Sequence, residues 1–221
     1  MNLPVAPRLP TVKGVAFGLL LAAMTTVTVA EPDASQPPAN FTPRFWITLL
    51  ADYSKHPLSG VIKQIIAGQT GAQPSWKLPL LVQGLQRAPQ RCSLSAYCPR
   101  DRDGGDSCTA WGTRVRRGII AADRRHWGPG SVIWIGSPVN QICIVEDVGG
   151  AVLGKNRFDV CLAGGSHDCW QFGRPRGVEY VPLYRTPPRR HWGRRPAGWQ
   201  PPVLNLERLA ERIGLETETK G

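Results

Sequence analysis

The sequence lacks an apolar run long enough to cross a membrane. The main candidate, residues 15–24, is an uninterrupted stretch of apolar and small residues, whereas a membrane-spanning helix needs about 20. Arg8 and Lys13 precede this stretch, and Val-Thr-Val-Ala follows at 27–30. This order is typical of a secretory signal over residues 1–30, or of an uncleaved signal anchor, because Thr28 fits the −3 position poorly. We therefore expect an exported protein, periplasmic or extracellular, that stays on the membrane only if the anchor is retained.

The sequence also lacks the paired spacings that structural zinc sites use. Its cysteines and histidines form no Cys-x-x-Cys and no His-x-x-x-His pair, so a zinc site on Cys161, His167 and Cys169 ranks well below disulfides. The sequence thus predicts no metal and no cofactor. In an oxidising compartment, six cysteines predict up to three disulfides whose pairing is open. Cys161 with Cys169 is a plausible local bridge, and the full set is Cys92, Cys98, Cys108, Cys143, Cys161 and Cys169.

Acidic residues are scarce, with 16 against 27 Lys and Arg and a net charge of +11. Removing residues 1–30 takes away Arg8 and Lys13 but no acidic residue, which leaves +9. Such a charge favours anionic partners. For an exported protein these partners are an anionic wall polymer or an acidic lipid rather than a specific nucleic acid. The plainer explanation of the positive charge is that it keeps the protein soluble.

Turn residues divide the rest of the chain into three regions. Residues 31–90 are predicted to form a linker and one or two short helices. Residues 91–184 contain about six short strands separated by turns, which favours a small closed β-barrel. Residues 185–221 are predicted to be a basic, Pro- and Arg-rich tail with a short amphipathic helix over 204–215. The predicted strands cover 93–97, 118–123, 131–136, 141–146, 157–162 and 177–183, with a short helix over 167–172.

The stretch 147–159 places two carboxylates around a tight turn. A predicted strand leads to Asp147, Gly149-Gly150 turns the chain, and the returning strand carries Asp159. Glycine pairs allow the positive φ angles and close backbone approach that such turns use. We therefore expect the two carboxylates to lie near one another, although a lone Asp-x-Gly-Gly more often only caps a turn.

Several ordered motifs resemble the three-aspartate family, or 3D domain. They cover residues 109–123, 129–135 and 147–159, preceded by Ala-Tyr-Cys-Pro at 96–99. The resemblance extends over roughly residues 93–183. It implies a mainly β fold, a small six-stranded double-psi β-barrel with short helical flanks at both ends. The same domain forms the catalytic part of membrane-bound lytic transglycosylase A, which cleaves peptidoglycan glycan strands.

The resemblance also implies a role for each aspartate. Asp159 matches the catalytic acid, Asp147 matches its supporting carboxylate, and Asp123 matches a position that we expect to be structural. The implied reaction is cleavage of the MurNAc-GlcNAc bond by one Asp acid/base, with a 1,6-anhydro product. Two alternatives stay open: a hydrolase that uses both aspartates, and a barrel that binds peptidoglycan without cleaving it.

Three further residues are expected to bind the glycan. Trp111 and Trp127 lie in polar, turn-rich segments, where their rings are expected to stack on sugars. Arg157 lies two residues before Asp159 and is also expected to bind the glycan. Its positive charge would also lower the pKa of Asp159, which opposes a role for that residue as a proton donor.

Overall fold

The computed structural model describes residues 41, 43–67, 76–98, 108–162, 164–202, 206–212 and 214–215. The predicted signal, residues 1–30, and the linker up to residue 40 lie outside these ranges. Within them, no helix is both long and apolar enough to cross a membrane.

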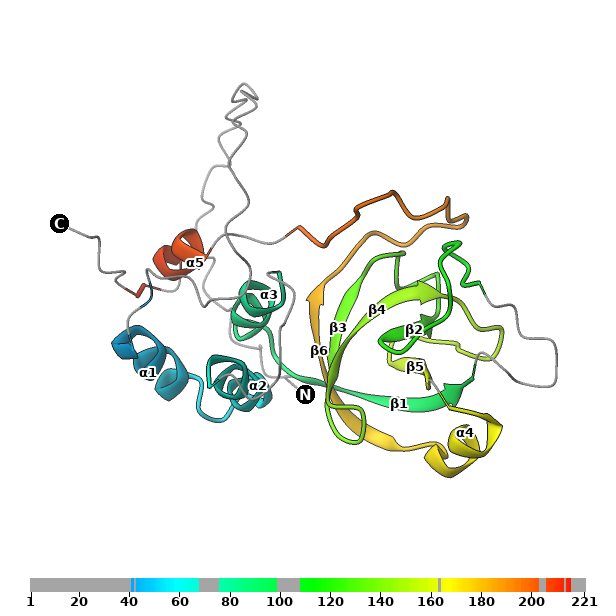
Figure 1. Ribbon diagram of the computed structural model, residues 1–221, viewed down its shortest axis with the longest axis horizontal. Helices are drawn as coiled ribbons and strands as arrows, with labels where there is room; N and C mark the ends of the chain where they lie inside the picture. Colours follow the sequence, from blue (N-terminus) through cyan, green and yellow to red (C-terminus); the bar gives the residue numbers. More distant parts are fainter. Residues whose placement is uncertain are drawn as a thin grey trace, which may run out of the picture. The chain divides into compact units, whose positions relative to one another are not determined.

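Six strands close into a barrel (Figure 1). Around the barrel the order is β1-β5-β2-β4-β3-β6. The pairs β1·β5 and β2·β4 are parallel, and the other neighbours are antiparallel. The predicted mainly β, six-stranded barrel is thus confirmed. Its strands are β1 (Gln90–Tyr97), β2 (Ile119–Ala122), β3 (Val132–Ile135), β4 (Gln141–Asp147), β5 (Arg157–Cys161) and β6 (Arg176–Tyr184).

Side chains fill the interior of the barrel. Successive residues of a strand point to opposite faces, so in β5 Phe158 and Val160 enter the core. Trp127 packs edge-on against Phe158 with 5.5 Å between ring centroids, and Tyr180 packs against the same ring at 5.2 Å. Because the interior is packed, a functional site must lie outside it, on the outer faces of the strands or on the loops.

Helices cover one outer face of the barrel, over β3 and β6 (Figure 1). Their apolar side chains form one cluster with Val132, Val181 and Leu183. A Cβ on Gly84 would lie 2.5 Å from Leu183 and 2.7 Å from Leu58, so glycine lets the third helix approach β6 closely. The helices are α1 (Pro43–Asp52), α2 (Pro57–Ile66), α3 (Lys77–Gly84), which was not predicted, and α5 (Leu206–Arg212).

One disulfide joins Cys98, just after β1, to Cys169 in α4 (Ser166–Phe172). The predicted local bridge between Cys161 and Cys169 is therefore wrong, and Cys169 is also removed from the alternative zinc set. Cys161 ends β5 in register with Tyr97 and packs in a small apolar cluster with Ile119. The four remaining cysteines are free thiols, exposed at Cys108 and buried at Cys92, Cys143 and Cys161.

Residues 185–202, the C-terminal strap, run back along the barrel (orange in Figure 1). The Gly128 N–H donates to the Thr186 carbonyl at 3.3 Å, and the Arg195 N–H donates to the Trp111 carbonyl at 3.0 Å. Thr186 also bonds the buried Ser131 hydroxyl. This part of the predicted tail thus belongs to the barrel's packing rather than standing apart from it.

Candidate active site

Four residues form a row across the outer face of the barrel: Ser95, Asp159, Ala121 and Asp147. The strand register pairs Ser95 with Asp159, and it pairs Ala121 with both Asp159 and Asp147. Neighbouring strands lie about 4.8 Å apart, so the backbones of the two aspartates are separated by about 10 Å. Ala121 contributes only a methyl group between them, and this residue is 3% exposed.

A β-bulge brings Asp147 into this row. Ile120 pairs with Val145, but the next residue of β2, Ala121, pairs with Asp147. Glu146 is therefore the extra residue of β4. Without it, Asp147 would be displaced from the register of Asp159, because a shift of one residue moves a side chain to the other face. Bulges next to active sites commonly re-aim a side chain in this way.

Asp159 is half-buried, and its Oδ1 atom has no hydrogen-bond partner within the described part of the chain. Burial raises the pKa of this carboxyl, and the nearby Asp147 carboxylate raises it further. Ser95, Arg157 and Arg174 act in the opposite direction. The expected lowering by Arg157 is thus present, but desolvation outweighs it and is a larger cause than the second carboxylate.

Asp147 is held in place by backbone donors. Its Oδ1 accepts a hydrogen bond from the Ala110 N–H at 3.0 Å and another from the Val148 N–H at 2.9 Å. Tyr97 lies next to this pair, and its pKa is raised by burial and then by the charge of Asp147. Sequence reasoning missed Tyr97 as a site residue. The available signal was its place at the end of β1, beside the strand that carries Asp159.

Asp123 stands apart from the row and anchors the neighbouring loop. Its Oδ2 accepts a hydrogen bond from the Gly154 N–H at 2.8 Å. The same oxygen forms an ion pair with Arg125 Nη2 at 2.7 Å. The Arg125 side chain is the main cause that lowers the pKa of Asp123 well below its usual range. These contacts fit the structural role that we expected. A cavity of about 450 Å³ lies beside this anchor, between Ala122–Arg125 and the Gly149-Gly150 turn.

Two of the predicted glycan-binding residues are buried. Trp127 is fully buried in the barrel core, and its indole N–H donates to the Lys155 carbonyl at 2.8 Å. Trp111 is only 5% exposed and packs edge-on against Trp199 at 5.1 Å. Neither ring has a free face for a sugar, so these two predictions are corrected. Arg157 is half-buried on the outer face, two residues from Asp159.

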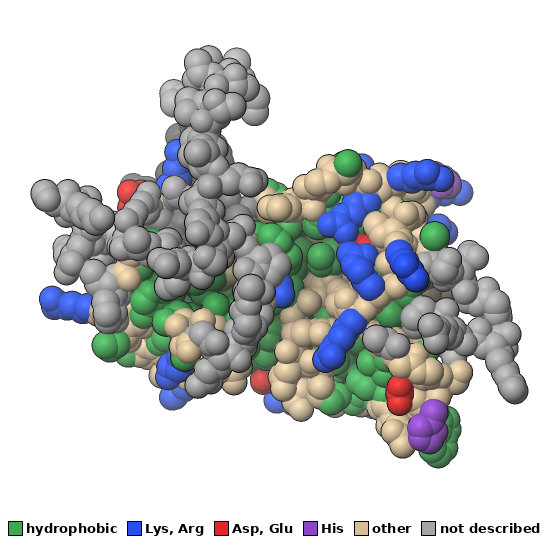
Figure 2. Space-filling view, in the orientation of Figure 1, with side chains coloured by type: hydrophobic (Ala, Val, Ile, Leu, Met, Phe, Trp, Pro, Cys, Tyr) green, Lys and Arg blue, Asp and Glu red, His purple; other side chains and the backbone are tan. Residues whose placement is uncertain are grey.

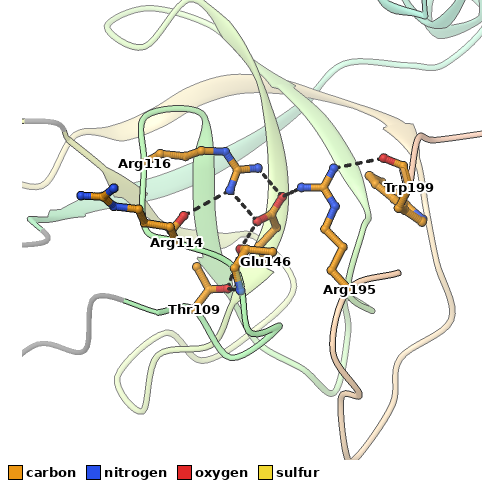
Figure 3. Close-up of polar contacts among 7 residues, drawn as sticks. Thr109, Arg114, Arg116, Glu146, Arg195 and Trp199 are labelled. Atoms are coloured by element: carbon orange, nitrogen blue, oxygen red, sulfur yellow. Dashed lines mark hydrogen bonds and ion pairs between the residues drawn. The ribbon is translucent and has the colours of Figure 1, made fainter. Parts of the chain in front are cut away.

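The bulged residue Glu146 is fully buried between two arginines (Figure 3). Its Oε1 lies 2.8 Å from Arg116 Nη2 and 2.9 Å from Arg195 Nη1. The Thr113 hydroxyl also donates to Glu146. Buried charges of this kind require such partners. The cluster was missed because Glu146 comes at the end of an apolar run within the strand and its second arginine comes from the distant strap.

This cluster fixes the turn that holds Asp147. The Glu146 carbonyl accepts from the Trp111 N–H at 3.0 Å, and the Trp111 carbonyl accepts from the Arg195 N–H. Arg195 donates further to the Trp199 carbonyl at 3.0 Å (Figure 3). Ala110, which donates to Asp147, lies immediately before Trp111 in the same turn. The strap therefore supports the position of Asp147 through the turn at 109–113.

Residues 118–181 match the family model of the 3D domain. The chain carries a 3D domain. The matched range contains Asp123, Asp147 and Asp159 and runs from β2 into β6, whereas β1 with Ser95 and Tyr97 precedes it. The 3D domain is associated with cell-wall-degrading barrel domains. A search of curated proteins found no match to this chain.

Proposed function

We propose that this 3D domain cleaves the bond between N-acetylmuramic acid and N-acetylglucosamine in peptidoglycan, as a lytic transglycosylase with Asp159 as its acid and base. The observation that carries the proposal is the environment of Asp159. The carboxyl is half-buried, one of its oxygens has no partner among the described residues, and burial raises its pKa. A proton donor needs a pKa raised toward the working pH.

The reaction needs only one acid/base group. Protonated Asp159 gives its proton to the glycosidic oxygen, and the bond from that oxygen to C1 of the muramic sugar breaks. The 6-hydroxyl of the same sugar then attacks C1, and its proton passes to the Asp159 carboxylate. This closes a 1,6-anhydro ring and restores the acid. Attack within one molecule has an effective molarity of up to ~10⁵ M or more, so no positioned water is required.

Asp147 supports this reaction by its charge and position. The sugar ring gains positive charge in the transition state, and a carboxylate held by the Ala110 and Val148 N–H groups stabilises that charge without having to reorient. The same negative charge disfavours the ionisation of Asp159. Asp147 is therefore a supporting carboxylate in this proposal and not the proton donor.

The partner proposed for the basic surface is an anionic wall polymer or lipid met after export. Figure 2 shows Lys and Arg side chains gathered over the barrel, with few acidic side chains on the same face. The strap and an adjoining turn contribute exposed arginines, namely Arg124, Arg189, Arg190 and Arg194. Positive charge on this scale attracts polyanions over a distance of about 8–10 Å at physiological salt.

The test is a digest of purified peptidoglycan by the full chain, prepared under oxidising conditions, with products identified by mass spectrometry. We expect anhydro-ended muropeptides, and we expect Asp159→Asn to reduce their formation by about 10²- to 10⁴-fold. Asp52→Asn, at an exposed position of α1, is the control. Hydrated reducing ends would instead indicate a hydrolase. No products, with both proteins still pelleting with the peptidoglycan, would indicate a binding barrel.

A further inference from the structure

Helix α4 borders the row of carboxylates on the β1 side. The Cys98–Cys169 disulfide ties the helix to the residue that follows Tyr97. After the helix the chain returns to the same strand, because the Pro175 carbonyl accepts from the Leu94 N–H at 2.9 Å. Leu94 precedes Ser95, the neighbour of Asp159 in the row. The helix therefore lies beside the C-terminal end of β1 (Figure 1), and the segment that follows it contacts the strand next to Ser95.

The chain after α4 also stays near this side of the barrel. Arg174, two residues after the helix, is one of the charges that lower the pKa of Asp159. Trp170 is four residues earlier in the chain, in the helix that the disulfide holds beside the end of β1.

Trp170 presents a free aromatic ring at this border. It is 81% exposed, and α4 contains no buried residue. The His167 ring stacks beside it, with centroids 6.5 Å apart and planes inclined by 24°. An exposed tryptophan leaves a large apolar surface in water at a cost in free energy, and covering that surface with the apolar face of a ligand would recover it. The adjacent disulfide fixes the helix that carries the ring before a ligand arrives.

We propose that Trp170, with His167 beside it, is a stacking subsite for a neutral N-acetylhexosamine ring of the glycan strand, removed from the bond held at Asp159. The choice of a peptidoglycan glycan strand as the ligand rests on the proposed function, but stacking of a sugar ring on Trp170 does not depend on cleavage. This subsite takes the place of the stacking role expected for Trp111 and Trp127, whose rings are buried.

Binding is measured in the Asp159→Asn background, so that the glycan stays intact. The probes are a soluble N-acetylglucosamine tetramer, followed by calorimetry and tryptophan fluorescence, and purified peptidoglycan, followed by pelleting. We expect Trp170→Ala to weaken binding by about tenfold, and Trp170→Phe to retain most of the affinity. Ile47→Ala, a control at another exposed apolar residue, 70% exposed on α1, should bind as the parent does.

Kinetics of the cleaving protein separate this subsite from the proposed function. We expect Trp170→Ala to raise KM with kcat unchanged, because stacking remote from the reacting bond is uniform binding. A parent that cleaves, with Trp170→Ala equal to it in both binding and KM, overturns the subsite and leaves the function standing. A parent that does not cleave but loses binding on Trp170→Ala keeps the subsite and overturns the function. Absence of binding by the parent to both probes overturns the subsite.

Discussion

Asp159 occupies a position that favours its protonated form more than water does. An unperturbed Asp has a pKa of about 3.9, and burial raises the value for Asp159 in the folded protein. The contribution of this residue to stability is therefore fully present below about pH 4 and is lost as the pH rises through the raised pKa. The protein carries an ionisable group in its site at the expense of stability at neutral pH.

Replacing this residue should make the protein more stable while it removes activity. We expect Asp159→Asn to have a higher Tm than the parent at pH 7, because the amide cannot ionise, and the difference should vanish near pH 4. Thermal unfolding of both proteins from pH 4 to pH 8 measures this. A variant that is less stable at pH 7 would show that the carboxylate is stabilised in the fold, and it would remove the argument for Asp159 as the acid.

Asp123 has the opposite electrostatics. Its pKa is lowered, so its stabilising contribution is present above about pH 4 and is lost as the pH falls. Arg125 is largely exposed, which reduces the value of that ion pair, but the buried carboxylate also accepts from Gly154. We expect Asp123→Ala to lower the unfolding free energy by about 2 kcal/mol, or roughly 4–8 °C in Tm.

The control for this change is Asp52→Ala, at an exposed position of α1, which should shift Tm by less than about 2 °C. Equal effects of the two substitutions would mean that Asp123 does not anchor the 149–155 loop. Urea unfolding of the parent and both variants at pH 7 provides an independent comparison.

Burial of single residues was the part of the site that local sequence could not predict. Trp127 lies among polar residues and next to a Gly-Pro-Gly turn, which is the pattern of an exposed residue. Its ring is buried because Phe158 and Tyr180, far away in the chain, close around it, and Arg185 covers it at 4.9 Å. The aspartates were easier to predict, because strand ends and a Gly-Gly turn restrict where carboxylates can lie.

At the scale of elements, the C-terminal strap is the part that the sequence pattern described least well. Proline and arginine without periodicity indicate a tail, because such a segment has no helix or strand of its own. In the structure its polar groups are satisfied by the barrel instead, as Arg195 shows with Glu146, Trp111 and Trp199. The strands, in contrast, follow from apolar runs between turns, and all six were found.

The strap makes a quantitative prediction through Arg195. Removal of this side chain leaves the fully buried Glu146 with one arginine fewer. Because Arg116 and Thr113 remain, the cost should be about 1–3 kcal/mol, which is below the cost of an unpaired buried charge. We expect Arg195→Ala to lower the unfolding free energy by that amount. The turn at 109–113 should also exchange its amide hydrogens faster, as measured by mass spectrometry.

A double-mutant cycle separates the lost pair from general damage to the strap. If the cost arises from the buried charge, Glu146→Gln combined with Arg195→Ala should be less destabilising than the sum of the single changes. Arg189→Ala, exposed in the same strap, is the matched control and should have an effect within about 0.5 kcal/mol. Additive costs would show that Arg195 acts through packing alone.

At the scale of the whole molecule, the two outer faces of the barrel have different tasks. The face of β3 and β6 is covered by helices, whereas the face of β1, β5, β2 and β4 carries the row of carboxylates. Strand positions alone do not say which face is covered. The family resemblance supplied the six-stranded double-psi barrel, but the order of strands around it was not predicted, because local patterns contain no information on which strands become neighbours. The cysteine pairing had the same limit, since Cys98 and Cys169 meet only when the barrel closes.

The cysteines test this closed arrangement. Burial raises the pKa of Cys92 and Cys143 to about 12 and that of Cys161 to about 11, so these thiols should be unreactive in the folded protein. Thiol labelling should modify only Cys108 under native conditions, four thiols after unfolding, and six after unfolding with reduction. Mass spectrometry of the labelled protein gives these numbers directly. Two labelled thiols or fewer after unfolding alone would indicate additional disulfides.

The disulfide should stabilise the whole barrel and not only α4. It closes a loop that spans 71 residues and includes most of the strands, so it restricts the unfolded chain strongly. We expect the variant Cys98→Ser/Cys169→Ser to lose about 3 kcal/mol of unfolding free energy, or roughly 6–12 °C in Tm. The control is Cys108→Ser, at the exposed free thiol, which should melt as the parent does. Because the bridge also holds α4 beside β1, the double variant should bind the N-acetylglucosamine tetramer less tightly even where it remains folded. Unchanged melting would show that the bridge is dispensable for the fold, and unchanged binding in a folded double variant would show that the disulfide does not position Trp170.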